Sequence, residues 1–436
     1  MMSKWQTKKL SKVTEKIFSG GTPATTNKAY WNGDINWLSS GETSNRFIFD
    51  TIQKISLLGV ENSSTKLALQ WDTVIASAGQ GKTRGQTALL KVDSYINQSI
   101  IALRANRNEI TPLWLFYNLS NRYSELRNIS DSHSSRGSLT TALLKDLEIS
   151  FPSINEQDKI TGILFAIDNK IQLNTQTNQT LEQIAQAIFK HWFIDFAPVH
   201  AKANALARGE TIEQAELAAM ACLSGKTAEK ITALQHTAPE AYHQLQQTAR
   251  AFPSEFVESE MGLVPKGWEW LKIENIISRL KNKQKINKNN ISDIGNIPVF
   301  EQGQNILMGY HSDNPAFIAT PQDPIFIFGD HTCMTHISTK PFSIYQNVIP
   351  IKGKDIPTLW VYLAVKDKQK FQEYRRHWME FIIKEICLPN RDLIEHFVEL
   401  VTHLFEKKDA IYEQNKILRK VRDELLPKLL SGEIEL

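Results

Sequence analysis

The chain has 436 residues, of which 22% are charged and 42% hydrophobic, and its formal net charge is +3 at pH 7. This composition is typical of a folded globular protein with two or three domains, and no global basic character points to nucleic acid. Its three cysteines are far apart, and no apolar run approaches the ~18 residues of a membrane span. The N-terminus lacks the apolar core of a signal peptide. We therefore expect a cytoplasmic protein without a disulfide framework.

Residues 1–152 are predicted to form a mixed α/β domain. Short β-type runs, Thr73–Ala76 and Ser99–Leu103, alternate with loops, and a helix is expected over Leu113–Arg127. The domain closes at Leu147–Pro152, where alternating residues predict a strand ended by proline.

A long helix is predicted next, over residues 153–197. Its seam positions are spaced alternately four and three residues apart, which is the 3.5-residue repeat of a coiled coil. The seam consists of Ile160, Leu164, Ile167, Ile171, Asn174, Asn178, Leu181, Ala185 and Ile188. The two asparagines stand where Leu or Ile would stabilise more, and such polar seam residues commonly fix the register.

Residues 198–267 separate this helix from the second half of the chain. Residues 198–251 are rich in Ala and Gln with helical spacing, so a helical insertion is expected there. Residues 253–267 carry two prolines and two glycines, which is typical of a linker.

The second half of the chain repeats the first. Trp5 aligns with Trp268 and Pro152 with Pro389, and four further matches fall between them in the same order. The offset decreases steadily from 263 to 237, as small loop deletions in the second copy would produce. We therefore predict a second domain over residues 268–389 and an internal duplication.

A second long helix is predicted over residues 390–436, in register with the first at an offset of 237. Its seam consists of Phe397, Val401, Leu404, Lys408, Ile411, Asn415, Leu418, Arg422 and Leu425. Lys408 and Arg422 interrupt this apolar seam. Either their charged ends extend to solvent, or they face a further partner that buries more of the helix.

Several motifs accompany this layout. They are Gly20–Pro23, Tyr30–Trp37, the strand ended by Pro152, Glu156-Gln157 at the start of the helix and Phe189–Phe196. With the duplication, these motifs make essentially the whole chain resemble the specificity subunit of type I DNA restriction–modification enzymes.

The resemblance implies a mixed α/β (α+β) fold with two similar target-recognition domains. These are separated by two long antiparallel coiled-coil helices and related as a pseudo-twofold internal duplication. Each domain would read half of a split, asymmetric DNA sequence. The helices would space the domains and dock two methyltransferase subunits, to which motor-nuclease subunits add. The residues expected to serve pairing and docking are Ile160, Leu164, Ile167, Ile171, Asn178, Leu181, Leu404, Ile411, Asn415 and Leu418.

Residues Ala76–Thr83 look like a phosphate-binding loop but depart from it in two ways. A P-loop needs Gly at its first position and a helix after its Lys-Thr pair. Here the first residue is alanine, and Arg84-Gly-Gln follows. We instead expect the loop to bring Lys82 and Arg84 against DNA, with Gln80 able to pair with adenine. A plain solvated turn is the alternative.

The aligned loop of the second copy, residues 329–336, contains three potential metal ligands of the His and Cys type. A structural zinc site needs four ligands with paired spacing. We therefore favour a DNA-facing loop with His331 and Thr332 as contacts, and we expect neither a metal nor a cofactor in the chain.

Other basic and polar residues of the two domains are further candidates for DNA contact. Residues 279–288 form the strongest basic run and suit phosphate. Residues 132–136 and 375–378 occupy matching places before the closing strands. The additional candidates are Ser135, Arg136, Lys281, Lys283, Gln302, Arg375 and Arg376. A solvated surface is the alternative for each.

No catalytic motif is recognised. The Asn/Asp-Pro-Pro-aromatic loop of adenine methyltransferases is absent, with Asn314-Pro-Ala as the nearest approach, and so is a glycine-rich methyl-donor fingerprint. The Asp/Glu-x-Lys triplets of metal nucleases occur only at Asp168–Lys170 and Glu406–Lys408, inside the predicted long helices. We therefore expect a non-catalytic DNA-recognition subunit. A self-contained restriction–methylation enzyme and a coiled-coil scaffold are the alternatives.

Overall fold

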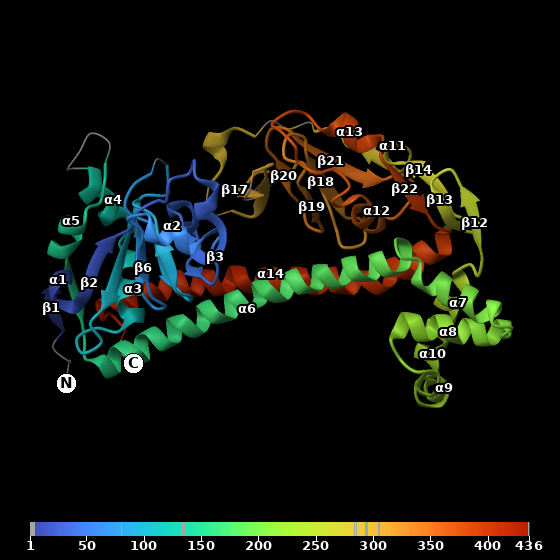
Figure 1. Ribbon diagram of the computed structural model, residues 1–436, viewed down its shortest axis with the longest axis horizontal. Helices are drawn as coiled ribbons and strands as arrows, with labels where there is room; N and C mark the ends of the chain where they lie inside the picture. Colours follow the sequence, from blue (N-terminus) through green and yellow to red (C-terminus); the bar gives the residue numbers. More distant parts are fainter. Residues whose placement is uncertain are drawn as a thin grey trace. The chain divides into compact units, whose positions relative to one another are not determined.

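The structure is a computed structural model that describes residues 5–79, 81–131, 137–282, 284, 286–292, 295–303, 306–434 and 436. The contacts of the chain divide it into two compact units. Unit 1 comprises Met1–Leu173 with Asn415–Leu436, and unit 2 comprises Asn174–Gln414. The boundary falls inside the two longest helices, so each of these helices contributes one part to each unit (Figure 1).

Unit 1 contains two mixed sheets and one separate strand pair. The orders are β2-β10-β7-β8-β4, β5-β3-β9-β6 and β1-β11. The strands are β1 (Gln6–Lys9), β2 (Thr14–Ser19), β3 (Trp31–Leu38), β4 (Phe47–Ile48), β5 (Gln53–Ile55), β6 (Lys66–Ala68), β7 (Thr73–Ala76), β8 (Thr87–Leu90), β9 (Ser94–Ile96), β10 (Ile100–Ala105) and β11 (Glu148–Phe151). The central strands β7 and β10 are apolar runs buried almost throughout, as strands covered on both faces require.

The helices of unit 1 cover these sheets. They are α1 (Leu10–Val13), α2 (Leu57–Glu61), α3 (Pro112–Asn121), α4 (Tyr123–Asp131) and α5 (Thr141–Asp146), besides parts of the two long helices. α3 supplies the fully buried Trp114, Phe116 and Tyr117 to the main core, which also contains Leu164 and Leu429 of the long helices.

The helix predicted over Leu113–Arg127 is in fact two helices. Thr111 begins α3 as a cap, because its hydroxyl accepts a hydrogen bond from the Trp114 amide at 3.2 Å. The backbone leaves helical geometry at Arg122, between α3 and α4. The Arg122 guanidinium donates to the Glu148 carbonyl of β11 at 2.6 Å, a contact that sequence periodicity does not reveal.

Unit 2 contains a second set of sheets with the orders β15-β21-β18-β19, β17-β16-β20 and β14-β22. The strands are β14 (Glu269–Lys272), β15 (Ile277–Arg279), β16 (Ile297–Phe300), β17 (Leu307–His311), β18 (Ile325–Gly329), β19 (Thr335–Ser338), β20 (Ser343–Ile344), β21 (Val348–Gly353) and β22 (Glu385–Leu388). The short helices are α11 (Ile273–Ile276), α12 (Thr358–Val365) and α13 (Trp378–Ile382). Every residue of α12 is buried, Trp360 completely.

The strand pairings of unit 2 repeat those of unit 1 in the same chain order. The antiparallel pair β1–β11 corresponds to β14–β22, and the parallel pair β3–β9 corresponds to β16–β20. One ion pair is repeated as well: Arg104 lies 2.7 Å from Asp72, and Lys352 lies 2.5 Å from Asp323. The predicted internal duplication is confirmed.

The two predicted long helices are α6 (Ile154–Phe193) and α14 (Arg391–Ser431). Much of the predicted seam is buried, and the residues concerned are Ile160, Leu164, Ile171, Asn174, Leu181, Ala185, Phe397, Val401 and Asn415. Others are half-buried, namely Ile167, Asn178, Leu404, Ile411 and Leu418. The 3.5-residue spacing therefore identified the faces on which the two helices pack.

The two helices are antiparallel within each unit, because residues of rising number on α6 meet residues of falling number on α14. The polar contacts that show this are Asp168 with Arg422 (2.7 Å) and Ile171 with Asn415 (3.2 Å) in unit 1, and Asn174 with Gln414 (2.8 Å) and Asn178 with Lys408 (3.3 Å) in unit 2. The seam asparagines are thus hydrogen-bonded across the helix pair, as register-fixing residues are.

Arg422, one of the two cations in the predicted seam, belongs to a buried polar network. It pairs with Asp168, whose side chain is 2% exposed. Asp168 also accepts hydrogen bonds from Tyr117 Oη at 2.8 Å and Arg46 Nε at 3.0 Å. Burial, the charge of Asp168 and its hydrogen bond raise the pKa of Tyr117, so the phenol stays neutral and donates.

Lys408, the other seam cation, lies in a similar network in unit 2. Its ammonium group pairs with Glu182, which also binds Lys366 and accepts a hydrogen bond from Tyr362 Oη at 3.0 Å. The chain thus supplies partners for both seam cations. Neither extension to solvent nor a further subunit is needed to account for them.

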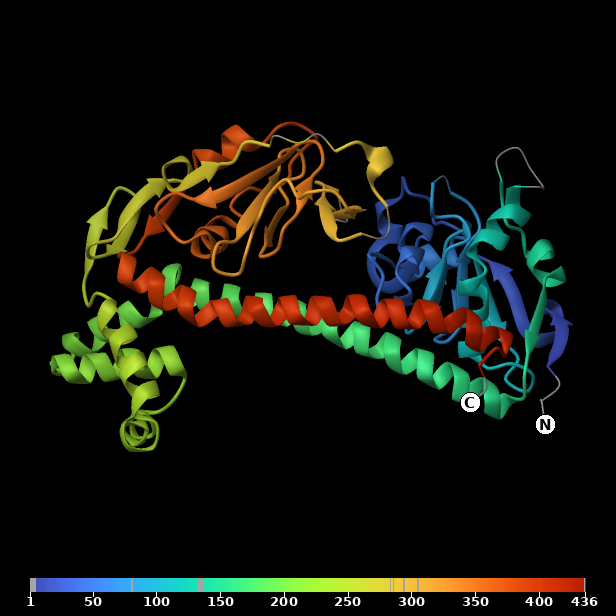
Figure 2. The ribbon, with the colours of Figure 1, turned by 180° about the vertical axis from the view of Figure 1, so that it is seen from behind.

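The insertion is helical, as predicted. Its helices are α7 (Ala197–Ala207), α8 (Ile212–Ser224), α9 (Ala228–Thr237) and α10 (Pro239–Ala251), and they gather into one small bundle, yellow-green in Figure 2. The predicted linker over residues 253–267 differs, because it forms a hairpin of β12 (Phe256–Ser259) and β13 (Gly262–Pro265). Its glycine and proline mark the ends of β13 rather than an unstructured connection, with Gly262 at φ +100°. Within the described residues, no helix is long and apolar enough to cross a membrane.

Candidate nucleic-acid interface

In unit 1, the candidate interface is the loop between β7 and β8. β8 begins at Thr87, so no helix follows the Lys-Thr pair and the loop is not a P-loop. Gly85 adopts φ +87°, and a Cβ there would lie 3.5 Å from atoms of Tyr123 and Arg127. The positive φ is what favours glycine here, since a Cβ would make only ordinary van der Waals contact with α4.

The loop is held by side chains of α4. Tyr123 Oη donates to the Lys82 carbonyl at 2.9 Å, and Arg127 donates to the carbonyl of Gly81. These bonds use the backbone of the loop and leave the Lys82 side chain exposed. An exposed cation on an anchored loop is suited to contact phosphate.

Arg84, predicted to contact DNA, is placed differently from Lys82. Its side chain is 8% exposed, and its guanidinium pairs with Asp131 at the end of α4. A Cβ on Gly137 would collide with this guanidinium, so Arg84 also packs against the chain after α4. The structure thus gives Arg84 an intramolecular role, and its DNA contact stays a prediction. Gln80, Ser135 and Arg136 lie outside the described residues.

In unit 2, the corresponding turn between β18 and β19 contacts a neighbouring loop. The His331 amide donates to Gln302 Oε1 at 2.9 Å. A Cβ on Gly329 would lie 2.6 Å from Thr332 Oγ1 and 2.9 Å from Gln302 Cβ, so only glycine allows this close packing. Three candidates from two distant segments are therefore brought together: Gln302, His331 and Thr332.

The segment before α13 joins the same cluster. Asp330 Oδ1 accepts hydrogen bonds from the amides of His377 and Trp378 at 3.2 and 3.0 Å. The Tyr374 ring stacks on His331 with centroids 4.8 Å apart and an interplanar angle of 25°. Tyr374 is 73% exposed, so it presents a positioned aromatic face to solvent.

Arg375 and Arg376 differ in their surroundings. Arg375 is half-buried and pairs with Glu373 and Glu380, so its charge is compensated. The Arg376 side chain is 79% exposed, and its Nε lies 3.8 Å from Asp330 Oδ2. Arg376 is therefore the better placed of the two for an external anion. Lys281 is also exposed, and Lys283 lies outside the described residues.

Two residues of this cluster were not predicted. Tyr374 contributes the exposed ring, and Asp330 positions the segment that carries it. The only signal in the sequence is an aromatic residue beside two arginines, a combination found in many solvated loops. The stacking partner of Tyr374 is 43 residues away and was visible only in the structure.

The metal hypothesis for residues 329–336 finds no geometric support within the described part of the chain, where no group of three or more His, Cys, Asp or Glu side chains could hold a metal. Burial lowers the pKa of His336 to about 4, and its ring packs edge-on against Phe300 at 4.8 Å. Burial also raises the pKa of the Cys333 thiol to about 11. A neutral thiol and an imidazole used in packing make a poor ligand pair.

Fold and loops together define a duplicated binding protein, in which one α/β fold occurs twice with different polar side chains on equivalent loops. A family model, the type I restriction modification DNA specificity domain, matches residues 2–183. The type I restriction enzyme HindI specificity subunit of Haemophilus influenzae is 32% identical over 435 residues, covering 92% of this chain and 94% of that protein.

The MjaIX specificity subunit of Methanocaldococcus jannaschii is 23% identical over 465 residues, covering 99% of this chain and 93% of that protein. Among solved structures, the S subunit of a type I restriction-modification system from M. genitalium aligns with a TM-score of 0.48 and 14% identity, covering 98% and 96% of the two chains. From its similarity to the Haemophilus influenzae protein over nearly the full length of both chains, the chain belongs to the family of type I restriction enzyme specificity subunits.

Proposed function

We propose that this chain is the non-catalytic subunit that selects the DNA sequence for a type I restriction–modification complex. Residues 1–152 and 268–389 are the two target-recognition domains, and each contacts one half of a bipartite target in double-stranded DNA. Residues 153–197 and 390–436 are the connecting helices, and residues 198–267 are an insertion. The observation that carries this proposal is the duplicated fold, within a chain of this family.

The two half-sites are proposed to differ in sequence, because the equivalent loops present different chemistry. The β7–β8 loop of unit 1 exposes Lys82 and is anchored on α4. The β18–β19 turn of unit 2 carries His331 beneath the exposed ring of Tyr374. An aromatic face and an imidazole suit base edges and stacking, whereas an exposed lysine suits phosphate.

The first test concerns the half-site that residues 268–389 are proposed to contact. Replacing both His331 and Tyr374 with Ala should weaken binding to DNA with both half-sites intact by ~1–3 kcal/mol for each base that the variant no longer reads. The variant should also stop discriminating against mutations in one half-site, while its discrimination against mutations in the other half-site stays unchanged. Methylation mapping in cells with the complete system would first define the target. Binding is then measured on oligonucleotides mutated in one half-site at a time.

A matched control for this test is Met379→Ala, which removes a side chain 68% exposed at the start of α13. It should leave both half-sites unchanged. If the double variant relaxed both half-sites equally, the cluster would be a general DNA contact and not a reader of one half-site.

Docking of methyltransferase subunits is proposed on the outward faces of α6 and α14, because the predicted seam residues are occupied by the helix pair. Exposed apolar residues recur on both helices at corresponding places. Ile163 and Ile184 of α6 are 39% and 41% exposed, and Leu400 and Val421 of α14 are 48% and 39% exposed. The offset of 237 that aligns the two helices maps Ile163 onto Leu400 and Ile184 onto Val421.

This repetition supports two equivalent docking patches. Ile163 and Val421 belong to unit 1, whereas Ile184 and Leu400 belong to unit 2. Each unit thus contains one member of this repeated set of four from each helix, as expected if two copies of one partner bind. Motor-nuclease subunits would join through the methyltransferases, and this assembly would act on DNA in the cytoplasm.

The docking proposal is tested with aspartate substitutions. The pair Ile163→Asp and Val421→Asp should remove one of two co-purifying methyltransferase subunits, because buried charges without partners oppose association. The pair Ile184→Asp and Leu400→Asp should remove the other. Native mass spectrometry counts the subunits. Ile417→Asp is the control, since Ile417 is 63% exposed but aligns with Thr180. Retention of both subunits by all variants would contradict the proposal.

A further inference from the structure

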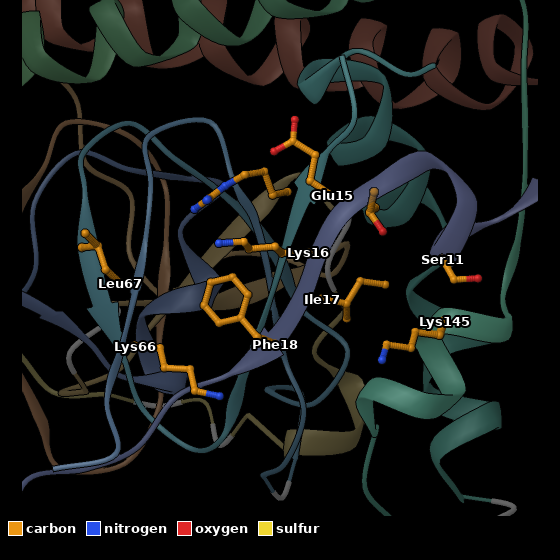
Figure 3. A pocket seen from close by; sticks show the side chains of 10 residues that line it. Ser11, Glu15, Lys16, Ile17, Phe18, Lys66, Leu67 and Lys145 are labelled. Atoms are coloured by element: carbon orange, nitrogen blue, oxygen red, sulfur yellow. The ribbon is translucent and has the colours of Figure 1, made fainter. Parts of the chain in front are cut away.

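Unit 1 contains an open pocket of about 510 Å³ that lies apart from the β7–β8 loop. Figure 3 shows Lys16, Lys66 and Lys145 around it, each from a different element. Lys16 is on β2, Lys66 on β6 and Lys145 on α5. All three are exposed, and none of them has an ion pair with another described residue. Glu15 is the one carboxylate among the lining residues.

A fourth cation at the pocket is already compensated. Arg104 makes a bidentate pair with the buried Asp72, through Nε at 3.0 Å and Nη2 at 2.7 Å. Hydrogen bonding to Asp72 raises the pKa of Arg104, so its charge is permanent. Lys16 lies directly opposite Arg104 across the antiparallel pair of β2 and β10. Asp72 compensates the charge of Arg104, so the charge of Lys16 is the one available to an external anion on this strand pair.

The second copy of the fold lacks this arrangement. β15 and β21 pair Ser278 with Lys352, so serine stands where the first copy has Lys16. The pairing of β6 with β9 is reduced in unit 2 to an isolated antiparallel bridge of Phe317 with Phe342, and the offset of 251 that aligns Asp72 with Asp323 puts Phe317 in the place of Lys66. Duplication therefore preserved the compensated cation and its carboxylate, Lys352 and Asp323, without the additional lysines. The second copy thus forms the equivalent strand pairing with Ser278 in place of Lys16.

We propose that this pocket binds a phosphate group through Lys16, Lys66 and Lys145. Three ammonium groups supply the donors, Ser11 adds a hydroxyl to the lining, and Phe18 and Leu67 give the pocket an apolar side. The phosphate belongs either to duplex DNA beyond the recognised half-site or to a free nucleotide. The DNA source rests on the proposed function, whereas the nucleotide source does not.

The test compares the full chain with the triple variant Lys16→Ser, Lys66→Gln and Lys145→Gln. Duplexes carry the complete target and are extended by about one turn, ~10 base pairs, on one side or the other. If the phosphate belongs to DNA, extending the duplex on one side only should increase the affinity of the wild-type chain. The triple variant should not show that increase. The slope of log affinity against log salt should also become less steep by about 0.9 for each phosphate that the variant no longer binds.

A second arm measures ATP binding by calorimetry without DNA. Binding that the wild type shows and the triple variant does not identifies a free nucleotide as the source of the phosphate. Lys12→Gln is the matched control, an exposed lysine on α1 that does not line the pocket. A triple Lys→Arg variant should keep binding, and thermal melting verifies that all variants fold.

If the triple variant behaves like the wild type in both the DNA arm and the ATP arm, the proposal that this pocket binds phosphate is wrong. A target duplex with one mutated half-site is measured in the same series. If the wild-type chain binds it as well as the intact target, the proposed DNA-reading function fails, while the ATP arm still decides the pocket.

Discussion

Asp168→Ala should lower the stability of the chain by about 3–5 kcal/mol, the cost expected when one partner of a buried charge network is removed. The substitution leaves the guanidinium groups of Arg422 and Arg46 and the hydroxyl of Tyr117 without their shared acceptor. Urea denaturation followed by circular dichroism measures the loss. Asp168→Asn keeps an acceptor but not the charge, and should fall between the alanine variant and the wild type.

The control for this prediction is Asp423→Ala. Asp423 also pairs with Arg422 at 2.7 Å, but its side chain is 60% exposed. Exposed ion pairs contribute roughly 0–1 kcal/mol, so this variant should unfold close to the wild type. Equal effects of the two substitutions would show that the buried network is not what stabilises the helix pair in unit 1.

Stability should also depend on pH through Glu182. Burial by itself would raise the pKa of this carboxyl, but the charge of Lys408 and hydrogen bonds from Lys366 and Lys408 lower it to about 2. A carboxyl whose pKa is lower in the folded state stabilises fully above its unfolded value near 4.5. That contribution is lost as the pH falls from about 4.5 toward 2, and a shift of this size corresponds to roughly 3 kcal/mol.

Glu182→Gln removes this titration. The difference in unfolding free energy between wild type and variant should be largest at neutral pH and should shrink below pH 4.5. Unfolding in urea at intervals from pH 7 to pH 3 measures it. Glu413→Gln is the control in the same unit, because Glu413 is 47% exposed and pairs only with Lys340 among the described residues. A constant difference across this range would contradict the assignment.

The two networks share one chemical plan. In each unit, a carboxylate on α6 binds a cation on α14 and a tyrosine hydroxyl from the buried helix of the recognition domain, α3 or α12. The tyrosine joins the recognition domain of that unit to its own segment of the helix pair. Because the donors are buried and geometrically specific, slipping either helix by one turn would leave charges without partners.

The sequence by itself determined the repeated layout. The steps of four and three residues located the packing faces of both long helices, because such a spacing returns to the same side of a helix. The steady fall in offset identified the duplication, since strand pairings such as β3–β9 and β16–β20 recur where the aligned segments lie. Ala76 and the residues Arg84-Gly-Gln also predicted correctly that residues 76–83 are not a P-loop, since β8 and not a helix follows them.

Only the tertiary structure decided which distant residues meet. In the sequence, Arg422 interrupts the apolar seam and no partner for its charge is evident, because Asp168 is 254 residues away. The contact of Arg84 with DNA stays a prediction, and only the structure revealed that its guanidinium is 8% exposed and pairs with Asp131, 47 residues away. Tyr374 carried no distinct signal until His331 was found beneath it. Periodicity reports which side of an element faces inward, whereas the identity of the facing residue depends on how the chain packs in three dimensions.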